Sequence, residues 1–80
     1  MKSRNNVIFG KALKNLRKAS GKTQEQLAFD AELDRTYISL LEVGNRSPSL
    51  DTLIALCKAL DISLIELAIE IERCKFQQKK

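Results

Sequence analysis

The 24 residues from 21 to 44 decide the fold of this chain, and they read GKTQEQLAFDAELDRTYISLLEVG. Near the start of this stretch, Thr23 and Gln26 have the spacing of a capping box. In that motif the Thr hydroxyl accepts a hydrogen bond from the third backbone N–H of a helix, and the Gln side chain bonds back to the Thr amide. A short helix is therefore expected from Thr23 to about Ala31.

A second short helix follows after two or three residues. Asp34 can cap it, it spans residues 35–43, and Gly44 supplies the left-handed conformation that ends it. Helices this short are marginal in water on their own, so the rest of the chain has to hold the pair at a fixed angle. Two short helices on a small scaffold match the helix-turn-helix arrangement, whose second helix enters the major groove of DNA.

Three further helices are expected around this pair. Apolar residues recur at helical spacing over about 6–20, before Gly21. Ser49 can cap a fourth helix, and a second capping box at 63–66 begins a fifth helix that runs to about Cys74. No segment alternates with period two, so the predicted fold is all-α, a compact bundle of five helices. The fourth helix is expected to bury six side chains, those of Leu50, Leu53, Ile54, Leu56, Cys57 and Leu60.

Length and composition restrict what else the chain can be. With 80 residues, 44% of them apolar, it is expected to form one domain over 1–80, of which about 73–80 form a basic C-terminal tail. A domain this small is only marginally stable alone, so a second subunit is expected. No apolar run is long enough to span a membrane and no signal peptide is evident, which predicts a cytoplasmic protein with no membrane partner.

The residue types of metal sites and enzymes are scarce. There is no His, and two Cys cannot complete a four-ligand zinc site. No Gly-rich phosphate motif occurs, and no nucleophile accompanies the carboxylates. We therefore expect no metal, no cofactor, no small-molecule ligand and no catalytic activity.

Charge is distributed unevenly along the chain, whose formal net charge is +4. Seven of the 14 basic residues lie within 1–22, where there is no acid, and all ten acids lie within 23–72. Such an arrangement suggests that one side of the molecule can approach a polyanion such as DNA. The alternative is that these charges are solvated helix faces.

The helix over 35–43 is expected to have two distinct sides. At about 100° per residue, one side is apolar and the other has a guanidinium and two hydroxyls. The inward side comprises Tyr37, Ile38 and Leu41, and the outward side comprises Arg35, Thr36, Ser39 and Val43, with Leu40 at its edge. Arg can bind guanine, Thr and Ser can bond base edges, and an aliphatic group can contact a thymine methyl. The predicted base contacts are therefore Arg35, Thr36, Ser39 and Leu40, and the alternative is an ordinary exposed helix face.

Residues on either side of the outward face are candidates for contacts with the DNA backbone. Thr23 and Gln24 lie at the start of the first short helix, where free amides and the helix dipole favour an anion. Asn45, Arg46 and Ser47 directly follow the second. Contacts of this kind set the register on DNA, whereas base contacts select sequence. The alternatives are that Thr23 is only a cap and that Arg46 is a mobile surface side chain.

The chain resembles the helix-turn-helix domain of phage repressors and of the xenobiotic-response-element (XRE) family. The resemblance covers roughly residues 9–70 and rests on Leu16-Arg17, residues 21–28, Tyr37-Ile38-Ser39, Glu42-Val43-Gly44, Pro48-Ser49-Leu50 and residues 56–60. Within the family, residues 33–39 are most similar to the controller proteins of restriction–modification systems. Those proteins are small dimers that regulate their own operon, so the resemblance implies a location in the bacterial cytosol and nucleoid.

The resemblance also implies roles for single residues. Arg35, Thr36 and Ser39 would face bases with Leu40 beside them, and Gln24, Tyr37 and Arg46 would contact the DNA backbone. Arg17 and Glu42 match a partly buried salt bridge that links the first and third helices. Family members often have Gln or Asn where Leu40 and Val43 stand here, which implies a larger contribution from DNA shape.

The fifth helix is too apolar to have a single buried stripe. Leu64, Leu67, Ala68, Ile71 and Cys74 form a first stripe that can close the core. Ile65, Ile69 and Phe76 form a second, which we predict to be the interface of a homodimer. Such a dimer would place two recognition helices about 34 Å apart on an inverted repeat. The alternative is that Phe76 and the tail fold back over the same domain.

The sequence favours one of three classes of function. The prediction is a transcription regulator that binds double-stranded operator DNA as a homodimer, as a restriction–modification controller protein does. The alternatives are a general XRE-type repressor and an antitoxin-like protein-interaction module. An enzyme is the third class, and no residue pattern supports it.

Overall fold

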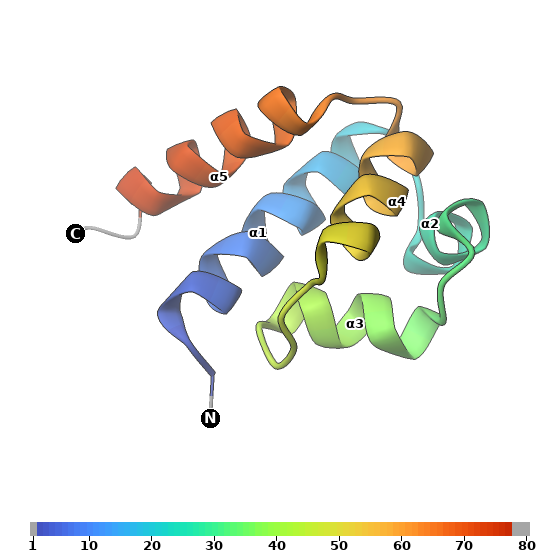
Figure 1. Cartoon of the computed structure of the whole chain (residues 1–80), viewed down its shortest axis with the longest axis horizontal. Helices are drawn as coiled ribbons and strands as arrows, with labels where there is room; N and C mark the ends of the chain where they lie inside the picture. The colour runs from blue at the N-terminus through green and yellow to red at the C-terminus, as the bar shows by residue number, and fades with distance from the viewer. Residues whose placement is uncertain (1, 78–80) are drawn as a thin grey trace.

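The computed structural model describes residues 2–77, and within this range it contains helices and no strand. The helices are α1 (Arg4–Ala19), α2 (Gln24–Ala31), α3 (Arg35–Val43), α4 (Leu50–Leu60) and α5 (Leu64–Gln77) (Figure 1). The all-α prediction is confirmed.

Most helix ends lie where the capping residues predicted them. The Thr23 hydroxyl accepts from the Gln26 N–H at 3.1 Å, and the Gln26 side chain accepts from the Thr23 N–H at 2.8 Å. Asp34 caps α3 by accepting from the Thr36 N–H at 3.1 Å, and Ser49 caps α4 by accepting from the Thr52 N–H at 3.1 Å. Gly44 ends α3 with a φ of +86°, the left-handed conformation that glycine adopts without strain.

Two ends differ from the prediction. Helix α1 begins at Arg4, because Ser3 caps it by accepting from the Asn6 N–H at 3.0 Å. Helix α5 continues to Gln77, beyond the expected end near Cys74. Residues 73–77 of the expected basic tail are therefore helical, and residues 78–80 lie outside the described part of the chain.

Helix α1 is the centre of the arrangement. It packs against α3 on one side and α5 on the other, while α2 packs against α3 and α4 (Figure 1). The main core is filled by apolar side chains from all five helices, including Leu13, Leu27, Ile38, Leu56 and Leu67. The short pair α2–α3 is thus held by a scaffold of three other helices, as its length requires.

The expected inward face of α4 is partly wrong. Leu56, Cys57 and Leu60 are buried and Leu53 is half-buried, but Leu50 is 65% and Ile54 48% exposed. Residues two apart on a helix lie about 200° apart, so they occupy opposite sides. The buried Thr52 takes the inward side of the first turn and excludes Leu50 and Ile54 from it.

The first stripe of α5 is also narrower than expected. Leu67 and Cys74 are buried and Ile71 is half-buried against the core, whereas Leu64 and Ala68 are exposed. Helix α5 packs mainly on α1, and one helix covers only a narrow strip of its neighbour. Leu64 and Ala68 lie at the edge of that strip and remain in contact with solvent.

Polar contacts fasten the outer helices to α1. The Asn15 side chain donates to Glu70 Oε2 at 3.1 Å, which joins α1 to α5. Hydrogen bonds from Arg73 and Asn15 hold the pKa of Glu70 below its ordinary value, although burial acts in the opposite direction. Lys22 Nζ donates to Asp30 and to the Ala59 carbonyl, both at 2.6 Å, which joins the α1–α2 turn to the end of α4.

Helices α1 and α3 are in close backbone contact at Gly10. A Cβ built there would lie 2.4 Å from the Leu41 carbonyl oxygen and 2.5 Å from that of Glu42. These atoms belong to the backbone of α3, which cannot rotate away as a side chain can. The close contact between the two helices therefore requires glycine at position 10.

Gly10→Ala tests this contact, because the sign of the change in the free energy of unfolding depends on the space at position 10. Alanine in a helix interior normally stabilises by roughly 0.5–1 kcal/mol relative to glycine. Here we expect a loss of about 1–3 kcal/mol in the free energy of unfolding, because α1 and α3 must separate. Chemical denaturation of Gly10→Ala, with the exposed neighbour variant Lys11→Ala as control, measures it. A stabilised Gly10→Ala protein would contradict the packing described.

Candidate nucleic-acid interface

Helix α3 presents one polar side to solvent. Arg35 and Thr36 are exposed and Ser39 and Leu40 are half-exposed, whereas Ile38 is completely buried. Its first turn contains no acidic residue. The four predicted base-contacting side chains therefore lie on or beside one accessible face, with a cation and hydroxyls available for hydrogen bonds.

The helical pattern also predicts Tyr37 and Leu41 on the inward side of α3 and Val43 on its outward side. Leu41 is completely buried and Tyr37 is half-buried, with its ring packed against the core. Val43 is 47% exposed at the C-terminal end of the outward side. An aliphatic group thus extends the polar face toward the following loop.

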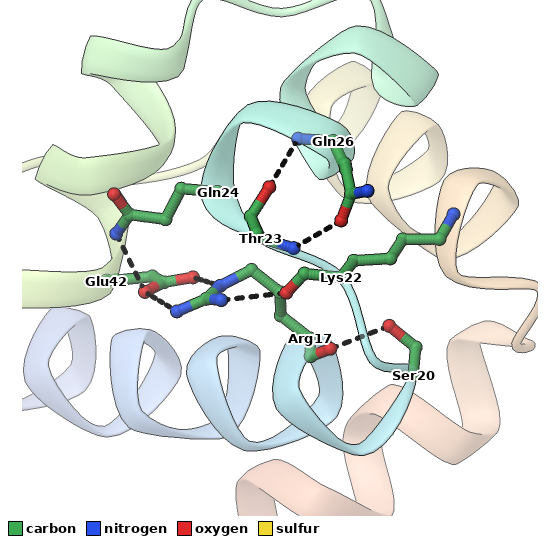
Figure 2. A network of polar contacts seen from close by, with 7 residues as sticks. All are labelled: Arg17, Ser20, Lys22, Thr23, Gln24, Gln26 and Glu42. Carbon is green, nitrogen blue, oxygen red and sulfur yellow. Dashed lines mark hydrogen bonds and ion pairs between the residues drawn. The ribbon is translucent and has the colours of Figure 1, made fainter.

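The start of α2 lies beside α3. Thr23 is exposed and its hydroxyl is occupied by the capping box (Figure 2). Gln24 is half-buried, and its side-chain amide donates to Glu42 Oε1 at 3.0 Å. One amide hydrogen of Gln24 is therefore used inside the protein, and a phosphate contact would use the other or the backbone N–H groups of the first turn.

A buried ion pair holds these elements together. Arg17 Nε donates to Glu42 Oε2 at 2.6 Å and Arg17 Nη2 donates to Glu42 Oε1 at 3.1 Å (Figure 2). The two side chains are only 10% and 3% exposed. Hydrogen bonding to Glu42 raises the pKa of Arg17 above its ordinary value, so the guanidinium stays charged.

The Arg17 network, comprising Arg17, Glu42, Gln24 and the Lys22 carbonyl, connects three helices. Arg17 belongs to α1, Gln24 to α2 and Glu42 to α3, and Arg17 Nη1 also donates to the Lys22 carbonyl at 2.9 Å (Figure 2). Lys22 lies directly before the α2 cap. The network thus fixes where α2 begins relative to α3.

The loop after α3 is anchored on two sides. Asn45, Arg46 and Ser47 are all exposed. The Ser47 hydroxyl donates to Asn6 Oδ1 at 2.8 Å, and the guanidinium carbon of Arg46 lies 5.4 Å from the centre of the Tyr37 ring. The three residues predicted to contact the DNA backbone therefore lie exposed in a loop that directly follows α3 and that contacts α1 and the Tyr37 ring.

Three residues that support this site, Asn6, Gly10 and Thr52, were not predicted from the sequence. Asn6 holds the loop and Gly10 permits α1 to approach α3. The Tyr37 hydroxyl lies 3.3 Å from Thr52 Oγ1, so Thr52 supports the aromatic ring. Each acts through a contact between distant residues, and no local motif could have indicated it.

The second stripe of α5 lies outside the core. Its members are exposed, Ile65 by 72%, Ile69 by 59% and Phe76 by 69%. We call these three residues the α5 patch. Such a concentration of apolar side chains in contact with water is typical of an interaction surface.

Within residues 2–77, two further kinds of feature are absent, a metal site and a membrane-spanning helix. No group of three His, Cys, Asp or Glu side chains there is arranged to bind a metal ion. Among the same residues, no helix has both the length and the apolar character needed to cross a membrane.

Residues 13–67 match the family model described as helix-turn-helix. The chain belongs to this family. The control protein C.MunI from a Mycoplasma species is 44% identical over 68 residues, which are 84% of this chain and 92% of that protein. The resemblance covers the α2–α3 pair and the helices that hold it.

Solved structures give the same result for this helix-turn-helix protein. The restriction-modification controller protein C.AhdI from Aeromonas hydrophila is 45% identical, with a TM-score of 0.79 over 81% of this chain and 98% of that one. The controller protein C.Esp1396I, solved as a tetramer in complex with its natural 35 base-pair operator, is 30% identical, with a TM-score of 0.85 over 91% of this chain and 96% of that one. The resemblance to controller proteins and the predicted fold are confirmed.

The Arg17 network can be tested by removing its carboxylate. Glu42→Ala leaves the Arg17 guanidinium buried without its counter-ion, and we expect a loss of about 3–5 kcal/mol in the free energy of unfolding. Gln24→Ala removes a single hydrogen bond and leaves the ion pair intact, so about 0.5–1.5 kcal/mol is expected. Urea titrations of both variants compare them, and equal losses would contradict the central role of the ion pair.

Proposed function

We propose that this protein is a sequence-specific DNA-binding transcription regulator that acts as a homodimer on an inverted-repeat operator, as the controller protein of a restriction–modification system. The observation that supports this most directly is the accessible side of α3, held rigidly by the buried Arg17 network. The operator complex of C.Esp1396I, a relative with the same fold, agrees with it.

The chemistry of the α3 face suits the major groove. Arg35 has the planar fork that matches the O6 and N7 of guanine, and the hydroxyls of Thr36 and Ser39 can donate to or accept from base edges. Leu40, at the edge of this face, can contact a thymine methyl group. Few hydrogen-bonding side chains are available, so DNA shape contributes to the choice of sequence.

Backbone contacts complete the proposed interface. Thr23 and Gln24 would meet a phosphate at the start of α2, where the helix dipole favours an anion. Asn45, Arg46 and Ser47 would meet the backbone beyond the end of α3, and Tyr37 would contribute to the same contacts. These contacts set the register, and the α3 side chains select the bases.

The exposure of the α5 patch supports dimerisation through it. Ile65 and Ile69 are exposed on a helix whose opposite side is packed on α1. A twofold symmetric contact would bury this patch against its copy and present two α3 helices to successive major grooves.

The remaining parts of the proposal concern the protein as a whole. Residues 1–80 form one DNA-binding domain that works in the bacterial cytosol at the nucleoid, without a cofactor and without catalytic activity. An XRE-type repressor would share this interface and differ in the genes beside its operator. An antitoxin-like module would instead use the α5 patch to bind a different protein.

Selection of bound sequences from random duplexes tests the function directly. The expected result is an enriched inverted repeat, which footprinting then locates on the protein's own promoter region. Failure to enrich any sequence would contradict sequence-specific binding, and enrichment of a single asymmetric half-site would contradict the dimer.

Two arginines are expected to act differently on the selected operator. Arg35→Ala should weaken specific binding by about 1–3 kcal/mol and relax the preference at one base pair, because the fork contacts a base. Arg46→Ala should weaken binding to all sequences and lower the slope of log affinity against log salt by about one. Titrations at several salt concentrations, on operator and random DNA, measure both effects. Equal losses on operator and random DNA for Arg35→Ala would contradict its role.

The dimer is tested by charging the α5 patch. We expect the double variant Ile65→Glu, Ile69→Glu to be monomeric at micromolar concentration and to lose operator affinity, because the acids would face their copies across the interface. Ile54→Glu, at an exposed apolar position of α4, is the matched control and should remain dimeric. Light scattering measures the mass, and a monomeric wild-type chain would instead favour a different protein partner.

A further inference from the structure

The Arg46 guanidinium lies over the ring of Tyr37, a residue of the recognition helix. Resting on the proposed function, we propose that Tyr37 acts on DNA through Arg46. In this view Tyr37 is a positioning residue: its ring holds the Arg46 guanidinium in the orientation that a phosphate contact requires. The alternative is that Tyr37 and Arg46 contact the DNA backbone independently of one another.

The Tyr37 ring is held from two directions. It is half-buried against the core, and its hydroxyl lies 3.3 Å from Thr52 Oγ1. Thr52 is itself buried and is fixed at the start of α4, where its oxygen accepts from Ser49 Oγ at 3.0 Å and its N–H donates to Ser49 Oγ at 3.1 Å. The Tyr37 hydroxyl is thus engaged inside the fold, and the ring presents a fixed surface to Arg46.

Arg46 uses only one part of its side chain in this pair. Its guanidinium carbon lies 5.4 Å from the ring centre, within the range of a cation–π interaction. Among residues 2–77, the Arg46 side chain makes no hydrogen bond and no ion pair. Its five N–H donors are therefore not engaged by the described part of the chain and remain available to a phosphate.

The backbone that supports Arg46 is fixed as well. The next residue, Ser47, is hydrogen-bonded to Asn6 of α1 at 2.8 Å. On the other side of the loop, Gly44 lies so close to Val7 that a Cβ at position 44 would be 2.8 Å from a Val7 methyl carbon. With both backbone and side chain held before binding, less conformational freedom is lost when Arg46 meets DNA.

A double-mutant cycle on the selected operator separates the two possibilities. Tyr37→Leu removes the aromatic face, and we expect a loss of about two- to fivefold in affinity, the value of an exposed cation–π contact. In the Arg46→Ala background the same substitution should have no further effect, because its target is gone. Tyr37→Phe keeps the ring, so Arg46→Ala should cost this variant as much operator affinity as it costs the wild type.

The contact between the Arg46 guanidinium and the Tyr37 ring can be tested on the free protein, without DNA. The Arg46 Nε–H resonance should show a ring-current shift in the wild type and in Tyr37→Phe, and lose it in Tyr37→Leu. A merely structural role of Tyr37 would not produce this signal. If Tyr37→Leu does not fold, Tyr37→Met, whose longer and unbranched side chain fills irregular space more readily, replaces it in both experiments.

The outcomes separate this proposal from the proposed function. Equal losses from Tyr37→Leu with and without Arg46 would show that Tyr37 contacts DNA itself and would overturn the positioning role. An Arg46 resonance without a ring-current shift in the wild type would show that Arg46 does not lie over the Tyr37 ring, and it would overturn the positioning role. A wild-type protein that binds no duplex would overturn the proposed function, and the positioning role with it, whatever the resonance shows.

Discussion

The buried ion pair between Arg17 and Glu42 is the constraint on which the rest of this structure depends. Two charges removed from water are tolerated only when each satisfies the other with good geometry. Here the guanidinium makes two hydrogen bonds to the carboxylate, and a third to the Lys22 carbonyl. Any movement of α1 relative to α3 would break this arrangement, so the pair fixes the angle at which α3 is presented.

The same pair couples both halves of the helix-turn-helix. Gln24, the first residue of α2, donates to the oxygen of Glu42 that also accepts from Arg17. The backbone of α2 is therefore fixed to α3 at the end where a phosphate is proposed to bind. Because Gly10 lets the backbones of α1 and α3 approach so closely, the ion pair is short and well shielded from water. The close packing at Gly10 and the Arg17–Glu42 ion pair thus favour the same relative position of α1 and α3.

Local signals made a large part of the fold predictable. The capping boxes at Thr23 and Ser63, the caps at Asp34 and Ser49, and Gly44 are all used as their spacing indicates. Predictions of burial were less accurate where two helices had to share an interior. Thr52 took the place expected for its apolar neighbours on α4, since its hydroxyl bonds with Ser49 and Tyr37. Helical spacing identifies a side of a helix, but it does not say how wide the covered strip is.

By itself, the sequence determined the five helices, their caps and the polar side of α3, because each of these depends on residues within about four positions of one another. Only the tertiary structure decided that Ser47 bonds to Asn6, 41 residues away, and that Arg46 lies over a ring held by Thr52. Those contacts depend on the distance and angle between helices. That geometry results from the packing of all side chains together, for which no short stretch of sequence contains the information.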